Sequence, residues 1–151
     1  MSSMWLVMLI VSLSLVAALT LTISALTVEQ DHEKSYQKEI KIALSNTDIS
    51  DYIRSVEVLP PEQLQEKCGS LNPSLLGCTV SMFNDTTDEF EYAKIYLSDF
   101  ANYLGCKTFS RVLYHEIGHM DYSYYYGSGG NESVRERAAD DYADRFVVDM
   151  C

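Results

Sequence analysis

The sequence predicts an α+β fold, with an N-terminal transmembrane helix followed by one compact domain built on a small, mostly antiparallel sheet. Three observations predict it. The first 28 residues contain no Asp, Glu, Lys, Arg or His. Strand-like patterns then precede two longer helical patterns. The remaining part, about 120 residues, suits a single domain, because domains usually contain about 100–200 residues.

Charge is confined to the part of the chain from Glu29 onward, called the body below. The chain has 22 Asp and Glu against 11 Lys and Arg, which gives a formal net charge of −11. A body this acidic lacks the basic surface with which proteins bind nucleic acids. The composition therefore excludes DNA or RNA as the main partner.

An almost wholly apolar run, the leader, covers residues 4–26. As a helix it spans roughly 35 Å, enough to cross a hydrocarbon core of about 30 Å. Secretory signals normally have a basic start and small residues at the cleavage site, whereas this leader has no basic residue and has Ile23 two positions before Ala25. We predict that residues 1–27 form an uncleaved membrane anchor. A cleaved signal peptide followed by secretion is the alternative, and a buried helix is the least favoured.

Two features disagree about the side of the membrane on which the body lies. Lys34, Lys38 and Lys41 follow the leader and no basic residue precedes it, which favours the cytoplasm by the positive-inside rule. An even number of cysteines without a C-x-x-C pair favours two disulfides in an oxidising compartment. The alternative is that all four cysteines are unpaired thiols in a reducing compartment. We predict an extracytoplasmic body. The cysteines are Cys68, Cys78, Cys106 and Cys151.

The predicted elements of the body begin after a linker at residues 28–46, and the domain proper is expected to cover residues 47–151. The linker is polar and charged at first, and its later alternation of apolar residues is too short to assign. Residues 52–59 alternate like a strand that stops at proline. A helix is expected from Pro61 to about Gly69, because proline is favoured in the first turn and glycine after the last.

Two strand-like runs, 77–83 and 92–98, flank a stretch rich in turn-forming residues and predict a β-hairpin. Just before it, Cys68 and Cys78 bracket a loop of Gly, Ser, Asn and Pro. A local disulfide between these two cysteines would close that loop.

Helical patterns over residues 108–124 and 132–150 follow the hairpin. The first contains the H-E-x-x-H motif. On a helix, positions i and i+4 share a face, so His115 and His119 can reach one metal ion. Glu116 then lies beside the metal, where its carboxylate can act on a bound water. A histidine pair without metal is the competing interpretation.

A zinc ion that keeps one position open for water needs a third protein ligand. Glu136 lies on the otherwise apolar face of the second helix, where a carboxylate requires a partner such as a metal ion. A capping box with Ser133, or a solvated position, is the alternative for Glu136. The reserve ligands are Glu132 and Asp121.

Asp140 falls one helical turn beyond Glu136 on the same side. A carboxylate there is placed to accept the free ring N–H of a ligating histidine, His115 in the first instance, and to fix its tautomer. A solvated aspartate is an almost equal alternative. Ala139 and Ala143 are small enough to let the two helices approach closely.

The two motifs together resemble those of a known enzyme family. H-E-I-G-H at 115–119 followed by E-R-A-A-D-D-Y-A at 136–143 resembles the gluzincin metallopeptidases. The similarity is closest to the minigluzincins and the ImmA/IrrE-like peptidases, and it covers roughly residues 92–150. The apolar leader and the cysteines depart from the pattern of the ImmA/IrrE-like proteins, which are usually cytoplasmic.

The resemblance implies a zincin-like domain with an active-site helix and a second, ligand-bearing helix. It implies that Glu116 is the general base. It also implies that strand 92–97 is the sheet edge at which an extended peptide docks by β-augmentation. The implied zinc ligands are His115, His119 and Glu136.

These inferences predict a membrane-anchored or secreted zinc-dependent metallopeptidase. Peptide bonds would be hydrolysed through a zinc-bound water activated by Glu116, and endopeptidase activity is expected because no terminus-binding pocket is indicated. A non-catalytic, membrane-tethered zinc-binding or structural protein is the alternative, since so small a body leaves little material for a deep cleft. A third interpretation is a latent peptidase restrained by residues 29–45. The oligomeric state stays open.

Overall fold

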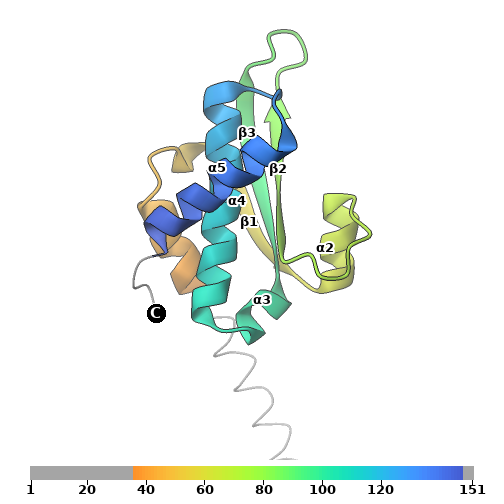
Figure 1. Ribbon diagram of the computed structural model, residues 1–151, viewed down its shortest axis with the longest axis vertical. Coiled ribbons are helices and arrows are strands. Elements are labelled where there is room, and N and C mark those ends of the chain that lie inside the picture. Colours follow the sequence, from red (N-terminus) through yellow and green to blue (C-terminus); the bar gives the residue numbers. More distant parts are fainter. Residues whose placement is uncertain (1–35, 148–151) are drawn as a thin grey trace, which may run out of the picture. The chain divides into compact units, whose positions relative to one another are not determined.

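The computed structural model describes residues 36–147 (Figure 1). The predicted anchor at 1–27 lies outside the described residues. Among the described residues, none of the helices has the length and apolar character needed to cross a membrane. The compact unit that contains the two motifs begins at Lys38. Residues 38–46 of the predicted linker therefore belong to this compact unit, which is called the body from here on.

A helix at residues 36–45 opens the described chain. Its side chains Glu39, Ile40 and Ala43 are buried, at the spacing of one helix face. The Glu39 carboxylate accepts a hydrogen bond of 3.3 Å from the Ser110 hydroxyl. The alternating apolar residues that the sequence left unassigned are thus part of a packed helix.

Three strands form one mixed sheet in the order β1-β3-β2. Strands β2 (Gly77–Phe83) and β3 (Phe90–Ser98) pair antiparallel, which confirms the predicted hairpin. Strand β1 (Ile53–Leu59) pairs parallel with β3. The sheet is therefore not mostly antiparallel. Helix α2 (Pro61–Cys68) carries the chain from β1 to β2 at the far edge. The connection from β1 to β3 thus contains both α2 and β2, which is long enough for a parallel pair.

The prediction that strand 92–97 is a sheet edge was wrong. Strand β3 lies at the centre of the sheet, where Ile95 is paired with Val56 on one side and with Thr79 on the other. Its backbone hydrogen-bonding groups are used by its neighbours. The edges of the sheet, within the described residues, are β1 and β2.

The sheet is covered on both faces, as two neighbouring residues of β2 show. Cys78 is bonded to Cys68 of α2, whereas Thr79 donates a hydrogen bond to Glu116 of α4. Successive side chains of a strand point to opposite faces, so α2 and α4 cover opposite faces (Figure 1). The side chains of Ile95 and Leu97, on the central strand, are fully buried.

Short helices and caps set the boundaries of the two motif helices. A 3-10 turn at Ser50–Tyr52 precedes β1, and α3 (Asp99–Tyr103) follows β3. Helix α4 (Cys106–Tyr126) contains the H-E-x-x-H motif, and α5 (Glu132–Phe146) contains the second motif. These helices confirm the two predicted helical segments, although α5 ends at Phe146 and not at about residue 150.

Candidate metal centre

The structure brings together the three side chains that were predicted to bind a metal ion. The Nε2 atoms of His115 and His119, on α4, lie 3.1 Å apart. The Glu136 carboxylate of α5 faces both rings, with Oε2 at 3.4 Å from His115 Nε2 and Oε1 at 3.4 Å from His119 Nε2. The possible ligand atoms of the three residues all lie within 4.8 Å of one another.

This donor set fits a zinc ion in chemistry and in spacing. Zinc binds histidine nitrogen and carboxylate oxygen at about 2.0–2.2 Å, usually with tetrahedral geometry. Ligands at such distances are separated by about 3.3–3.6 Å along the edges of the tetrahedron. The observed separations of 3.1 and 3.4 Å are close to that range. Three donors leave a fourth position, as catalytic zinc sites require.

A very close contact between α4 and α5 brings the three donors together. A Cβ atom on Gly118 would lie 2.7 Å from Ala139 Cα and 3.0 Å from its carbonyl oxygen. Ala139 and Ala143 are fully buried in this contact region, which confirms the predicted close approach. Gly118 was not identified from the sequence, although it lies next to His119.

The capping-box interpretation of Glu136 was wrong. Asn131, not Ser133, is the N-cap of α5, and its side chain accepts a hydrogen bond of 2.9 Å from the Ser133 backbone N–H. The reserve ligands Glu132 and Asp121 do not belong to the metal-competent cluster found among the described residues.

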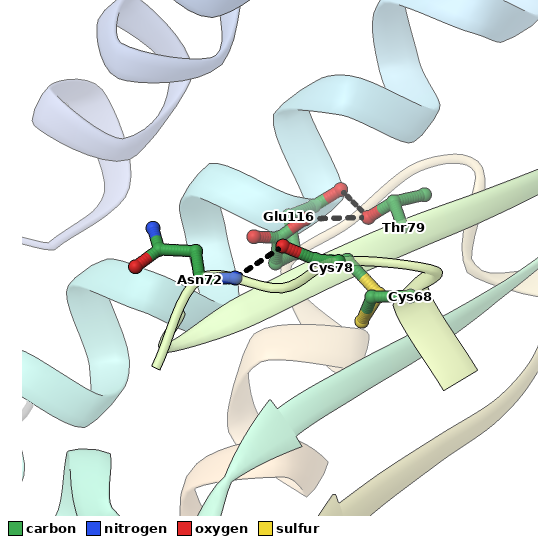
Figure 2. Close-up of a disulfide and its surroundings, with 6 residues drawn as sticks. Cys68, Asn72, Cys78, Thr79 and Glu116 are labelled. Carbon is green, nitrogen blue, oxygen red and sulfur yellow. Dashed lines mark hydrogen bonds between the residues drawn. A yellow bond between two sulfur atoms is a disulfide. The ribbon is translucent and has the colours of Figure 1, made fainter. Parts of the chain in front are cut away.

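Glu116 lies beside the cluster in a separate, buried environment. Its residue is only 5 % exposed. The Thr79 hydroxyl lies 3.0 Å from Glu116 Oε2 and 2.7 Å from the Glu116 carbonyl oxygen (Figure 2). Burial raises the pKa of Glu116 to about 8, the Thr79 hydrogen bond opposes this, and the negative charge of Glu136 adds to it. Without a metal ion, the surroundings of Glu116 therefore favour the protonated form of its carboxyl group.

Strand β2 leaves just enough room for this carboxylate. A Cβ atom on Gly77 would lie 2.8 Å from Glu116 Oε1, so a larger residue there would displace the Glu116 side chain. Neither Gly77 nor Thr79 was identified from the sequence, because 37 residues separate Thr79 from Glu116. No local pattern links such distant positions.

A disulfide joins Cys68 and Cys78, the local pairing that the sequence suggested without settling it, and it holds this part of β2 to α2. Cys78 lies between Gly77 and Thr79, the two residues that border Glu116, and its bond to α2 is on the opposite face of the strand (Figure 2). Cys106 is also disulfide-bonded. The described part of the chain contains no free thiol, so the interpretation as four unpaired thiols was wrong.

Asp140 makes the contact expected of it. Its Oδ1 lies 3.1 Å from His115 Nδ1, the ring nitrogen that faces away from the cluster. The Arg111 guanidinium lies 3.8 Å from the same oxygen and forms a closer ion pair with Asp144. Arg111 and Asp144 were not identified from the sequence. A carboxylate at Nδ1 fixes the tautomer in which Nε2 presents its lone pair to a metal.

The His119 ring is in the protonation state that metal binding needs. Burial lowers its pKa, while the charge of Glu136 opposes the shift. The lowered pKa favours neutral imidazole, which is the form that binds metal ions. Its Nδ1 atom is buried and has no hydrogen-bond partner among the described residues.

Comparison with family models, with curated proteins and with solved structures finds no match to this chain. The two helices nevertheless carry a His115/His119/Glu136 cluster consistent with an H-E-x-x-H type of site.

Proposed function

We propose that this protein is a zinc-dependent metallopeptidase, with an activity that hydrolyses internal peptide bonds. The observation that carries the proposal is the spacing of three donors, His115, His119 and Glu136, beside a buried carboxylate. Zinc bound there would polarise the scissile carbonyl and lower the pKa of a water molecule towards about 7.

Glu116 is the proton carrier in this proposal. Its carboxylate takes a proton from the attacking water and delivers it to the leaving amine. The pKa of about 8 belongs to the metal-free site. The positive charge of a bound zinc ion would lower it, so that the carboxylate can take up the proton near pH 7 and release it again. The Thr79 hydroxyl holds this side chain in position.

The remaining polar groups position the ligands. Asp140 holds the His115 ring through Nδ1, and Arg111 lies against Asp140 and Asp144. We assign these three residues a positioning role, because none of them belongs to the donor cluster.

An extended peptide substrate would dock on β2 in place of strand 92–97. Strand β2 is an edge of the described sheet. Its residue Thr79 donates a hydrogen bond to Glu116, and Gly77 leaves space for the Glu116 carboxylate. A sheet edge offers backbone N–H and C=O groups to an added strand. A peptide paired there would pass directly beside the proposed base.

The body would work outside the cytoplasm, tethered by the leader. The Cys68–Cys78 disulfide supports an oxidising compartment. Secretion after cleavage of the leader is the alternative for this location.

One observation favours a second function, a non-catalytic zinc-binding protein. Glu116 is almost fully buried and hydrogen-bonded, as a purely structural carboxyl group would be. The two functions differ in whether Glu116 is needed for turnover.

Cleavage of a peptide library by the full-length protein separates them. The wild type is expected to cleave, while Glu116→Gln is expected to bind zinc normally and to lose at least about 100-fold in kcat/KM, as loss of a general base does. Glu62→Gln, an exposed position on α2, is the matched control and is expected to cleave like the wild type. Undiminished cleavage by Glu116→Gln contradicts the proposal, and zinc binding without any cleavage favours the second function.

A further inference from the structure

Three large apolar side chains are exposed together on α3 and just after it. Phe100, Tyr103 and Leu104 are 50 %, 68 % and 49 % exposed. Their spacing of i, i+3 and i+4 places them on one face of a helical turn, while Ala101 is fully buried. We call these three residues the α3 patch.

The α3 patch lies at the end of the body where the chain enters it. Helix α3 leads into the start of α4 (Figure 1). The compact unit begins at Lys38, and the next residue, Glu39, accepts a hydrogen bond from Ser110 in the second turn of α4. The start of the compact unit, called the entry end of the body below, and the α3 patch therefore both adjoin the beginning of α4.

Three exposed lysines belong to the elements at this end of the body, although the whole chain carries a charge of −11 and α3 itself begins with Asp99. Lys38 and Lys41 are exposed on the helix at residues 36–45, and Lys107 is exposed in the first turn of α4. Aromatic and aliphatic side chains combined with lysines are typical of surfaces that meet lipid headgroups.

The connection between the leader and the body is short. Residues 27–37 join residue 26, the last of the apolar run, to the compact unit. Even fully extended, these residues reach at most about 40 Å. If the leader spans a bilayer, the entry end of the body cannot move far from the membrane surface.

We propose that the α3 patch contacts the bilayer in which the leader is anchored, with Phe100, Tyr103 and Leu104 in the headgroup region. This inference rests on the membrane anchor proposed above and is independent of peptidase activity. The contact would bury apolar surface that the body leaves exposed and would hold the body in one orientation to the membrane.

Fluorescence quenching by brominated lipids tests this contact in the full-length chain. Trp5→Phe removes the only tryptophan, and Phe100→Trp then places a single reporter in the α3 patch. Tyr126→Trp, in the same Trp5→Phe background, is the matched control, because Tyr126 is 71 % exposed and ends α4, about 30 Å from its start. Both variants are reconstituted in phosphatidylcholine–phosphatidylglycerol vesicles with and without bromine on the acyl chains.

The emission of the Phe100→Trp variant is expected to fall about twofold or more in brominated vesicles, as for interfacial residues, with little change for the Tyr126→Trp variant. Equal emission changes in the two variants, or no quenching of Phe100→Trp in chains that float with the vesicles, would overturn the contact. If lipid does not quench the tryptophan at position 100 and the chain dimerises through the α3 patch, the membrane contact is also overturned. The patch would then be assigned to contact with a second copy of the chain. Chains that do not float with vesicles would overturn both the anchor and the contact, while measured peptidase activity would be unaffected.

Discussion

Glu116 illustrates how the surroundings of a single residue decide its chemistry. Two contacts from β2 define its position, the Thr79 hydroxyl and the space left by Gly77. Burial raises its pKa to about 8, above the usual value of about 4.3 for a glutamate in an unfolded chain. The folded protein without metal therefore binds this proton more tightly than the unfolded chain does.

The stability of the metal-free protein is expected to depend on this proton. Between about pH 4.5 and pH 8 the folded state holds more protons than the unfolded state, so the free energy of unfolding falls as pH rises. Glu116→Gln removes this dependence. The stability of the variant relative to the wild type should rise by up to about 3 kcal/mol between pH 5.5 and pH 8.

Urea denaturation of chelator-treated full-length protein at these two pH values measures the difference. Glu62→Gln, on the exposed surface of α2, serves as the control and should keep the pH dependence of the wild type. The account of Glu116 fails if its glutamine variant keeps that dependence as well.

Asp140 would influence a bound metal ion through His115, which it contacts. Because its carboxylate meets His115 Nδ1 at 3.1 Å, Asp140→Asn is expected to weaken zinc binding about 10- to 100-fold, as losses of such partners do. Competition with a chromogenic chelator measures the affinity. Asp141→Asn, exposed on the same helix, should leave the affinity unchanged. An equal effect of the two substitutions would assign the loss to charge rather than to the contact.

At the scale of elements, the separation of α4 and α5 sets the geometry of the donors. The contact of Gly118 with the Ala139 backbone leaves no room for a methyl group. Gly118→Ala is expected to move the helices apart, with a loss of about 1–3 kcal/mol in stability and a clear loss of zinc affinity. Gly129→Ala, where no atom lies within 4 Å, is the control. Thermal unfolding and chelator competition measure both effects, and wild-type zinc affinity in Gly118→Ala would show that this contact does not set the site.

Local sequence patterns predicted the helices and strands themselves better than they predicted which strands pair with each other. The hairpin and the helix that contains His115 and His119 could be predicted from residue spacing over short segments. The role of Glu136 as a third donor was predicted from its place on a helix face. The pairing of β1 with β3 was not predicted, because a parallel pair joins strands that are distant in sequence and leaves no mark in either one. That pairing is what places strand 92–97 at the centre of the sheet.

At the scale of the whole molecule, the site is assembled from the sheet and two helices. Strand β2 contributes the surroundings of Glu116, α4 contributes two histidines, and α5 contributes Glu136 and Asp140. Arg111 could not be predicted, because its role depends on how α4 and α5 cross rather than on its neighbours in sequence. The Cys68–Cys78 disulfide, a pairing that the sequence left open, holds the sheet to α2 on the opposite face.

The zinc content of the purified full-length protein tests the central claim most directly. The wild type should hold one zinc ion per chain, Glu136→Gln should lose at least about tenfold in affinity, and Glu132→Gln, one turn away on α5 and exposed, should bind like the wild type. Absence of zinc from the wild type, or wild-type affinity in Glu136→Gln, would contradict a zinc centre formed by His115, His119 and Glu136.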